Sequence, residues 1–366
     1  MNILFYTPVN FRCRDIESLG ERFISEGHRV FLLSQCPEGP FHESARQLGF
    51  EVAALEVSSG QSLPGILKRV NQLIKFCRHN KIQVCFSHLE PTNFISVLAQ
   101  YFVSTRFVIY RHHLGMAKLY GFHRALSYRL TYKLARTIVC VSRQAKQYMI
   151  EEEKIDPKLI HHINLGYNFS LYPPPDSGNV VALRKKYSNS ILLVSAGRLV
   201  KYKRPIVGLE LLKELADRNV MCSIIYLGVG EEEEALRVYA REHSIQDRVS
   251  ILGYTHNILD YFAAADMLVH PSVDESSCVV VKEAALVRLP VMVCEDVGDF
   301  DDYMENRKNG IVLSKENFVE EAVAVLGEYA RDSRPFKQMA ANLHESITKR
   351  FDISQVIDKY KALIEG

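Results

Sequence analysis

The chain lacks any apolar run close to the ~18 residues that a membrane-spanning helix requires. Its apolar start, Ile3 to Tyr6, is too short for the core of a signal peptide, and Arg12, Arg14 and Asp15 follow closely. We therefore expect a cytoplasmic protein that is at most peripheral at the inner face of the membrane.

Paired cysteines are also missing. Eight cysteines are present, but no two form a C-x-x-C pair. Cys85, Cys140 and Cys294 lie inside apolar stretches that are typical of buried strands. This distribution predicts reduced, mostly buried thiols rather than a disulfide or zinc framework.

Net charge is low as well, with a formal value of +2. The overall charge therefore gives no reason to expect nucleic acid as a partner, and any attraction to anionic surfaces must come from a local group of basic residues. The 366 residues, 47% of them hydrophobic and 24% charged, suffice for two globular α/β domains.

The chain does contain a regular alternation of short apolar runs and amphipathic stretches, which is typical of doubly wound parallel sheets. The runs are apolar throughout, so both faces of each strand should be buried under helices. The expected strands span residues 3–6, 30–34, 84–87, 107–110, 138–141, 192–196, 222–227, 249–252, 267–270 and 291–294. The expected helices span residues 17–25, 206–217, 232–242, 258–264, 280–287, 319–329 and 354–364.

Three consecutive prolines interrupt this alternation, within Tyr172-Pro173-Pro174-Pro175-Asp176-Ser177-Gly178. Proline disfavours a helix interior and a central strand, so the segment predicts a semi-rigid linker. We expect one domain over residues 1–172 and a second over 173–350. A C-terminal helix within 351–366 is expected to pack back on the junction.

The segment richest in chemistry runs from His270 to Ala285 and contains Glu275 and Glu283. Pro271 ends a strand, a polar loop follows, and a helix begins near Val279. In an open α/β sheet, ligands gather at the carboxyl ends of the strands, and a helix start there suits a phosphate. Carboxylates accept hydrogen bonds, so both glutamates suit the hydroxyls of a ribose or hexose. Two solvated glutamates are the alternative.

This segment resembles the E-x7-E signature of the retaining, GT-B-fold glycosyltransferases of glycosyltransferase family 4. Further landmarks of that family follow the same order: Gly27-His28-Arg29-Val30, Gly197-Arg198-Leu199 with Lys203, Leu227-Gly228-Val229-Gly230-Glu231, Tyr261 to Ser272, and Glu283-Ala284-Ala285 with Leu289-Pro290-Val291. The resemblance covers most of the chain and is weakest over residues 35–105. It implies two Rossmann-like α/β domains, each a doubly wound parallel sheet, that face each other across a cleft.

The resemblance places the donor on the second domain. Arg198 and Lys203 correspond to the basic pair that holds the donor diphosphate and assists its departure. Two cations after a strand end neutralise a phosphate pair better than one, and two solvated cations are the alternative. Gly230 corresponds to a glycine of the donor-binding loop.

Two glutamates and a stretch of backbone complete the donor site that the resemblance implies. Glu283 corresponds to the ligand of the ribose, and Glu275 to the catalytic residue that faces the transferred sugar. The backbone amides of Ser276, Ser277, Cys278 and Val279 correspond to a stretch that also contacts the donor and is usually richer in glycine.

The strand over 107–110 leads into Arg111-His112-His113. The family commonly places a catalytic histidine here, and we assign that role to His112 with His113 as the alternative. A histidine pair also suits a metal, but no H-E-x-x-H motif or carboxylate at ligand spacing accompanies it. The sequence therefore predicts no metal and no cofactor beyond a UDP- or GDP-sugar donor.

The first loop departs most clearly from the family. Relatives usually carry a Gly-Gly pair there, whereas residues 8–15 contain no glycine. We expect Arg12 or Arg14 to grip the donor phosphate or an anionic acceptor by side chain, with two solvated arginines as the alternative. A further departure is Val297-Gly298-Asp299, where Gly-Gly is usual.

These features predict a metal-independent, retaining hexosyltransferase of polysaccharide or glycoconjugate synthesis. It would transfer sugar from a nucleoside-diphosphate donor to a glycan, a lipid-linked or another acceptor. The alternatives are a nucleotide-sugar epimerase and a non-catalytic nucleotide-sugar-binding protein of the same fold.

The segment Tyr120 to Arg136 combines apolar and basic residues at helical spacing. The apolar line is Leu126, Leu130 and Leu134, and the basic line beside it is Arg129, Lys133 and Arg136. Such a face suits a peripheral contact with anionic membrane, and a solvated basic face is the alternative.

Overall fold

The computed structural model describes residues 1–55, 62–113, 122–188, 190–255 and 257–365, and the backbone alone over 122–127. Two compact units make up the chain. The first comprises Met1–Leu171 and Phe351–Gly366, and the second comprises Tyr172–Arg350.

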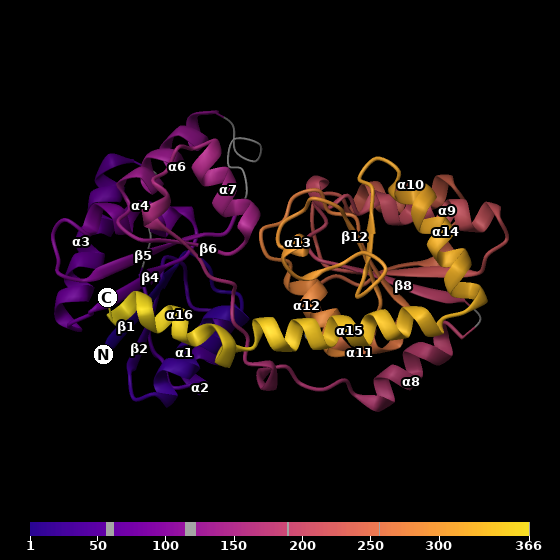
Figure 1. Ribbon diagram of the computed structural model, residues 1–366, viewed down its shortest axis with the longest axis horizontal. Helices are drawn as coiled ribbons and strands as arrows, with labels where there is room; N and C mark the ends of the chain where they lie inside the picture. The colour runs from indigo at the N-terminus through magenta and orange to yellow at the C-terminus, as the bar shows by residue number, and fades with distance from the viewer. Residues whose placement is uncertain (56–61, 114–121, 189, 256, 366) are drawn as a thin grey trace. The chain divides into compact units, whose positions relative to one another are not determined.

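A parallel sheet in the order β3-β2-β1-β4-β5-β6-β7 is the centre of the first unit (Figure 1). Its strands are β1 (Asn2–Thr7), β2 (Arg29–Ser34), β3 (Glu51–Ala54), β4 (Val84–Ser87), β5 (Arg106–Arg111), β6 (Ile138–Cys140) and β7 (Ile160–His162). The strand order reverses between β1 and β4, which is where open α/β sheets bind ligands.

Helices cover both faces of this sheet because its central strands are apolar on both sides. Residues 3–6 of β1, for example, are fully buried. The helices of the first unit are α1 (Arg14–Ser25), α2 (Pro40–Gln47), α3 (Leu63–His79), α4 (Glu90–Ala99), α6 (Phe122–Leu134), α7 (Arg143–Glu151) and α16 (Ile353–Glu365).

The C-terminal helix α16 is an integral part of the first unit. Arg106 of β5 donates to the carbonyl of Leu363 at 2.8 Å, and Lys361 lies 2.7 Å from Glu26. A Cβ added at Gly166 would lie 2.3 Å from Val356, so glycine allows the close approach. The last helix therefore completes the core of the unit in which the chain begins.

The second unit repeats this architecture around a parallel sheet in the order β10-β9-β8-β11-β12-β13 (Figure 1). Its strands are β8 (Ile191–Ala196), β9 (Cys222–Leu227), β10 (Val249–Ile251), β11 (Met267–His270), β12 (Val291–Cys294) and β13 (Ile311–Leu313). Its helices are α8 (Ser177–Lys186), α9 (Ile206–Asp217), α10 (Glu233–Glu242), α11 (Ile258–Ala264), α12 (Val279–Leu286), α13 (Phe300–Tyr303), α14 (Phe318–Arg331) and α15 (Arg334–Phe351). Its switch point lies between β8 and β11. The predicted α/β class is confirmed for both units.

The proline segment is shorter than predicted. Asp176 caps α8, because its Oδ1 accepts the backbone N–H of Asn179 at 2.8 Å. Its own N–H donates to Asp260 of α11 at 2.7 Å. Ser177 and Gly178 are therefore helical, and including them in the linker was wrong.

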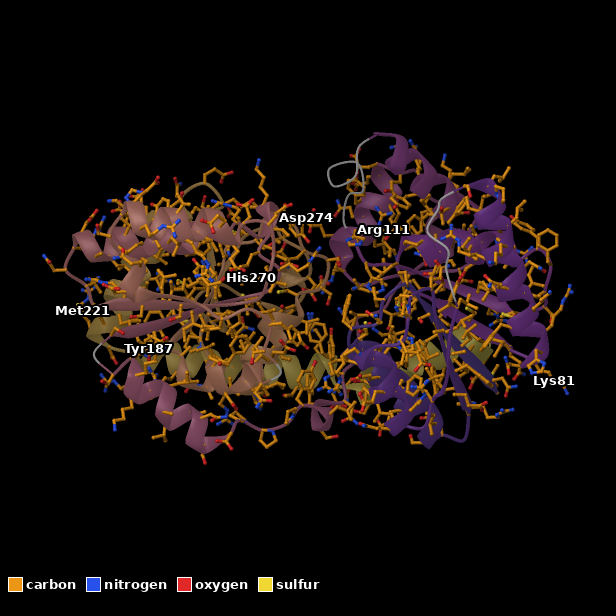
Figure 2. All side chains as sticks on the ribbon, turned by 180° about the vertical axis from the view of Figure 1, so that it is seen from behind. Lys81, Arg111, Tyr187, Met221, His270 and Asp274 are labelled. Atoms are coloured by element: carbon orange, nitrogen blue, oxygen red, sulfur yellow. The ribbon has the colours of Figure 1, made fainter. Side chains whose placement is uncertain are left out.

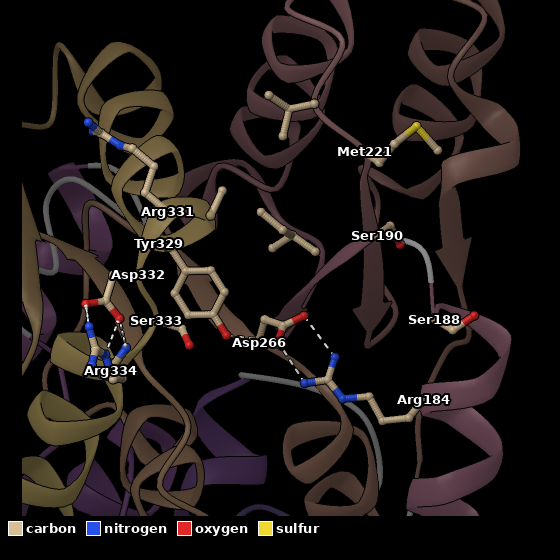
Figure 3. A pocket seen from close by; sticks show the side chains of 13 residues that line it. Arg184, Ser188, Ser190, Met221, Asp266, Tyr329, Arg331, Asp332, Ser333 and Arg334 are labelled. Atoms are coloured by element: carbon tan, nitrogen blue, oxygen red, sulfur yellow. Dashed lines mark hydrogen bonds and ion pairs between the residues drawn. The ribbon is translucent and has the colours of Figure 1, made fainter.

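A cavity of about 960 Å³ opens at the amino ends of the strands of the second unit (Figure 3). Asp266, just before β11, accepts two hydrogen bonds from Arg184 at 2.7 and 2.9 Å and a third from Tyr329 at 2.9 Å. The backbone N–H of Leu192 adds a fourth. Asp266 thus links α8, β8 and α14, and its role there is structural.

Helices in the described ranges do not combine the length and apolar character needed to cross a membrane. All eight cysteines are free, and Cys13 and Cys36 are the two that are not fully buried.

Candidate functional site

The carboxyl ends of β8 and β11 bring together the residues that carry the family signature. His270 is the last residue of β11, and the loop that follows leads through Asp274 and Glu275 to α12 (Figure 2). On the β8 side, the chain makes a short 3₁₀ turn over Lys201–Lys203 before α9. The backbone N–H of Val273 donates to the carbonyl of Tyr202 at 3.0 Å, which joins the two loops.

Glu275 is the centre of this site. Its carboxylate accepts from Lys203 and lies 2.7 Å from Nε2 of His270, and its side chain is only 8% exposed. Burial acts to raise the pKa of Glu275, but the charges and hydrogen bonds of Lys203 and His270 outweigh it and bring the value to about 2. Glu275 is therefore an anion held between two cationic groups.

His270 joins Glu275 to the start of α12. Its Nε2 lies 3.4 Å from Sγ of Cys278, the residue that precedes the first turn of the helix. Burial acts to lower the pKa of His270, but Cys278 and Glu275 raise it to about 9. The ring is 3% exposed, so this histidine is a buried cation.

The loop that ends in α12 is held by a second buried ion pair. Lys282 of α12 lies 2.6 Å from Asp299, and their side chains are 2% and 0% exposed. Asp299 also accepts from the hydroxyl of Ser277 at 2.9 Å and from the backbone N–H of Cys278 at 3.2 Å. The turn before α13 thereby fixes both residues.

The Cys278 contact changes one expectation. The amides of residues 276–279 were all expected to face the donor, but that of Cys278 is bonded to Asp299 within the protein. Gly298 permits this approach: its φ is +62°, and a Cβ there would lie 2.7 Å from Cβ of Glu275. The two departures from the family pattern, at residues 276–278 and at residues 297–299, therefore meet in one hydrogen bond, from Cys278 to Asp299.

Arg198 is exposed, unlike Lys203. Its guanidinium donates to the hydroxyl of Tyr202 and lies 5.7 Å from the centre of that ring. Lys203 is 19% exposed and is occupied by Glu275. The predicted pair therefore consists of one accessible cation and one that is already bound to a carboxylate.

Gly228 and Gly230 allow the loop after β9 to lie directly on the loop after β8. A Cβ at Gly228 would lie 1.9 Å from the carbonyl oxygen of Gly197, and one at Gly230 would lie 2.2 Å from that of Leu199. The backbone N–H of Leu199 donates to the carbonyl of Val229 at 3.0 Å. Gly230 thus shapes the surface beside Arg198 through backbone packing.

Glu283 follows in the second turn of α12 and is half-buried. The helix start, the loop of Glu275 and the accessible Arg198 all lie at the carboxyl edge of the sheet. This edge combines cations, helix amides and carboxylates, which suits an anionic ligand that also carries hydroxyls.

The first unit carries a separate group of charges at the carboxyl end of β1. Glu17 is fully buried and accepts from Arg12 at 3.1 Å and from Arg14 at 3.0 Å. Arg12 also donates to Ser44 at 2.8 Å. Two arginines share one carboxylate, so the group keeps one net positive charge, and the side chain of Arg12 is 40% exposed.

His112 and His113 follow β5 and contact different partners. Nε2 of His112 lies 3.1 Å from Nδ1 of His88, and burial together with the charge of His113 lowers the pKa of His112 to about 3. Nε2 of His113 lies 3.6 Å from Glu90. His112 is therefore neutral near pH 7 and His113 is the one beside a carboxylate.

His88 was not predicted as a site residue, although it directly follows β4 at the switch point. Its ring stacks on Tyr110 with centroids 4.0 Å apart, and its buried Nε2 has no hydrogen-bond partner among the described residues. The next residue, Leu89, has a φ of +72°, which is strained for a side chain of this type. His270, Lys282 and Asp299 were likewise missed as site residues, because their roles depend on contacts between distant loops.

Part of the amphipathic segment is described. Tyr120 and the side chain of Leu126 lie outside the described residues. Leu130 is 51% exposed. Tyr101 and Phe102, which lie shortly before β5 in the sequence, are 56% and 61% exposed. The guanidinium of Arg136 lies 5.4 Å from the centre of the Tyr101 ring. Apolar and basic groups therefore share this surface.

Comparisons with known proteins agree in both units. Residues 182–349 match the family described as Glycosyl transferases group 1, and residues 14–171 match Glycosyltransferase Family 4. An Escherichia coli protein named UDP-Gal:alpha-D-GlcNAc-diphosphoundecaprenol alpha-1,3-galactosyltransferase is 23% identical over 316 residues, which are 81% of this chain and 79% of that protein.

Solved structures show the same fold. Anabaena HepE in complex with UDP-glucose has a TM-score of 0.85 at 18% identity and covers 100% of this chain and 99% of its own. A glycosyltransferase from Rickettsia africae has a TM-score of 0.82 at 16% identity, over 100% of this chain and 97% of its own.

Proposed function

Because the chain belongs to the group 1 glycosyltransferases of glycosyltransferase family 4, we propose that it transfers a hexose from a UDP-sugar to a lipid-linked acceptor with retention of anomeric configuration. The observation that carries the proposal is the contact of Glu275 with Lys203 and His270 at the switch point of the second unit. A permanently charged carboxylate beside two cations suits a bound sugar diphosphate.

The donor occupies the carboxyl edge of the second sheet. Arg198 and Lys203 hold the diphosphate, and Glu283 holds the ribose hydroxyls. Glu275 faces the hydroxyls of the transferred sugar. UDP is favoured over GDP because the named relatives use UDP-Gal or bind UDP-glucose.

The chemistry is an exchange at the anomeric carbon. The bond from that carbon to the diphosphate oxygen breaks, and a bond to the acceptor oxygen forms on the same face. The acceptor proton passes to the departing phosphate, and Arg198 and Lys203 stabilise the charge that develops there. In this proposal His112, which is neutral near pH 7, contributes to catalysis as an uncharged imidazole.

Glu275 is not the nucleophile of a double displacement in this proposal. Its carboxylate is tied to Lys203 and His270, which weakens it as an attacking group. Glu275→Gln should lose donor turnover without accumulating a covalent glycosyl adduct, as followed by intact-protein mass spectrometry. A trapped adduct in any Glu275 variant would overturn same-face attack.

The acceptor belongs to the first unit. The Arg12–Glu17–Arg14 group keeps a net positive charge, which suits an anionic acceptor such as a lipid-linked diphosphate. The Escherichia coli relative is named for such an acceptor. Charge-removing variants at Arg12 and Arg14 should raise the acceptor KM by more than the donor KM. Equal Michaelis constants in variant and wild type would remove this role.

Transfer is proposed to occur at the cytoplasmic face of a membrane. Leu130, Tyr101 and Phe102 supply apolar contacts, and Lys133 and Arg136 supply charge. In liposome flotation, binding should require anionic lipid and fall on a Lys133→Glu/Arg136→Glu double substitution. Flotation that is independent of anionic lipid would reject the surface.

A donor panel tests the function as a whole. Release of nucleoside diphosphate from UDP-glucose, UDP-galactose and a GDP-hexose is measured with and without acceptor and with and without chelator. We expect acceptor-dependent release of UDP that survives chelation. Acceptor-independent conversion of one nucleotide sugar into another would indicate an epimerase, and binding without turnover a non-catalytic module.

A further inference from the structure

Three groups that bind metals converge at the start of α12. Within the described residues, a nitrogen of His270, an oxygen of Glu275 and the sulfur of Cys278 all lie within 4.8 Å of one another. All three side chains are nearly inaccessible to solvent. They come from three consecutive pieces of backbone: the end of β11, the loop and the cap of the helix.

These three ligand types favour some metal ions over others. Imidazole, carboxylate and thiolate together suit Zn²⁺ or Co²⁺, whereas Mg²⁺ and Ca²⁺ prefer sets made of oxygen. Metal–ligand bonds of about 2.0–2.3 Å place ligand atoms roughly 3.4–3.8 Å apart in a tetrahedral site. The distance between His270 and Cys278 is already 3.4 Å, whereas the 2.7 Å between His270 and Glu275 must widen by roughly 0.7 Å to reach the tetrahedral spacing.

We propose that His270, Glu275 and Cys278 form a site for a thiophilic divalent cation, Zn²⁺ above all, and that its occupation inhibits the enzyme. The inhibitory effect rests on the proposed function, in which Glu275 must be available to the donor sugar. Three protein ligands leave a fourth position for water, so the site can form without a further protein group.

Lys203 is the cation that competes for this site. Its ammonium already binds Glu275, so the pocket holds a positive charge in the metal-free state. Coordination uses the lone pair of a neutral imidazole and a thiolate, so metal ions and protons compete for the same atoms.

Cobalt reports on the ligands directly. The full-length protein is stripped with chelator and titrated with Co²⁺, and thiolate-to-cobalt charge-transfer absorption is recorded. Competition by Zn²⁺ then gives the zinc affinity. We expect one equivalent of Co²⁺ to produce the charge-transfer band, and Zn²⁺ to remove it.

Variants test whether the band arises at this site. Cys278→Ser should abolish the band and weaken zinc binding by more than about 10-fold, since even partners of metal ligands contribute that much. Lys203→Gln should tighten zinc binding, because it removes the competing cation. A Cys13→Ser/Cys36→Ser control removes the two least buried thiols and should keep the band.

The outcomes separate this inference from the proposed function. If the wild type shows no band, the proposed metal site is wrong. The same holds if Cys278→Ser keeps the band and the Cys13/Cys36 control loses it. Thermal unfolding of each variant checks folding, and the Lys203→Gln result stands even if Cys278→Ser is unstable. With the band present, UDP release that Zn²⁺ fails to inhibit would overturn the regulatory claim alone. No UDP release under any condition would reject the proposed function while leaving the metal site intact.

Discussion

Asp299 and Lys282 form an ion pair with an N–O distance of 2.6 Å, and neither side chain is more than 2% exposed. The same carboxylate accepts the backbone N–H of Cys278 at the start of α12. The pair therefore couples the turn before α13 to the loop that contains Glu275. A buried pair is costly to break, because removing one partner leaves the other as an uncompensated charge.

Asp299→Ala should destabilise the protein by about 3–5 kcal/mol, measured as the free energy of unfolding in urea. Asp301→Ala is the matched control: Asp301 lies two residues away, in α13, is exposed, and its substitution should change stability by less than about 0.5 kcal/mol. Lys282→Met combined with Asp299→Leu should recover part of the loss. A double variant that is no more stable than Asp299→Ala would show that charge compensation is not the main contribution of this pair.

Gly228→Ala should destabilise the second unit and lower donor turnover. The added Cβ would lie 1.9 Å from the carbonyl oxygen of Gly197, and the backbone φ of +150° disfavours any side chain. The expected loss is roughly 2 kcal/mol or more, which is typical of strain at a special backbone conformation.

Gly327→Ala supplies the control for that substitution. Gly327 lies within α14, and an added Cβ meets no atom within 4 Å. Alanine favours a helix by about 1 kcal/mol over glycine, so this variant should be slightly more stable than wild type. Thermal unfolding of both variants measures the difference. Equal midpoints would contradict the close packing of the loops after β8 and β9.

The sequence alone predicted several elements of the second unit correctly. The helices over 206–217 and 258–264 and the strands over 222–227, 267–270 and 291–294 have the predicted bounds. In these stretches the apolar periodicity, the turn residues and the burial all indicate the same bounds for each element. Helix α3 was missed, and it begins at Leu63-Pro64-Gly65, where the local signal is that of a turn rather than of a helix.

The candidate site was predicted only in part for a related reason. Glu275 and Lys203 are 72 positions apart, but a family pattern names both, so a resemblance sufficed. Nothing in the sequence pairs Lys282 with Asp299 or His270 with Cys278, because those contacts depend on how three loops fold onto one another. The sequence showed residues 276–278 and 297–299 as two separate departures from the family pattern. That they contact each other is evident only from the structure.

Asp15 should make stability depend on pH. Burial, opposed by backbone hydrogen bonds at the start of α1, raises the pKa of its carboxyl to about 6, against an ordinary 3.8. A raised acid pKa means that the folded state binds the proton more tightly than the unfolded state. The contribution of Asp15 is therefore fully favourable below about pH 4, is lost as the pH rises through about 6, and changes no further above that range.

Asp15→Asn removes this dependence. The variant should gain up to about 3 kcal/mol over wild type at pH 7, and the gain should disappear near pH 4. Urea unfolding at pH 4, 5, 6 and 7 measures it. Asp358→Asn, at a side chain that is 89% exposed, is the control and should follow the wild-type profile. A constant difference between Asp15→Asn and wild type would mean that the carboxyl does not titrate in this range.

The last prediction separates the two signature glutamates. Glu283→Gln should weaken the binding of UDP alone by about 10- to 100-fold, because hydrogen bonds from ribose hydroxyls to a charged acceptor contribute about 1.5–3 kcal/mol. Glu275→Gln should leave UDP affinity within about threefold of wild type, because UDP carries no transferred sugar, while lowering the turnover of UDP-hexose.

Calorimetric titration with UDP and a turnover assay with UDP-hexose measure the two effects on the same preparations. Glu242→Gln, an exposed glutamate of α10, is the control in both. Weaker UDP binding in Glu275→Gln than in Glu283→Gln would reverse the assigned roles. Such a reversal would place the ribose, rather than the sugar, beside Lys203 and His270, and the carboxylate between those two cations would then act on the nucleotide.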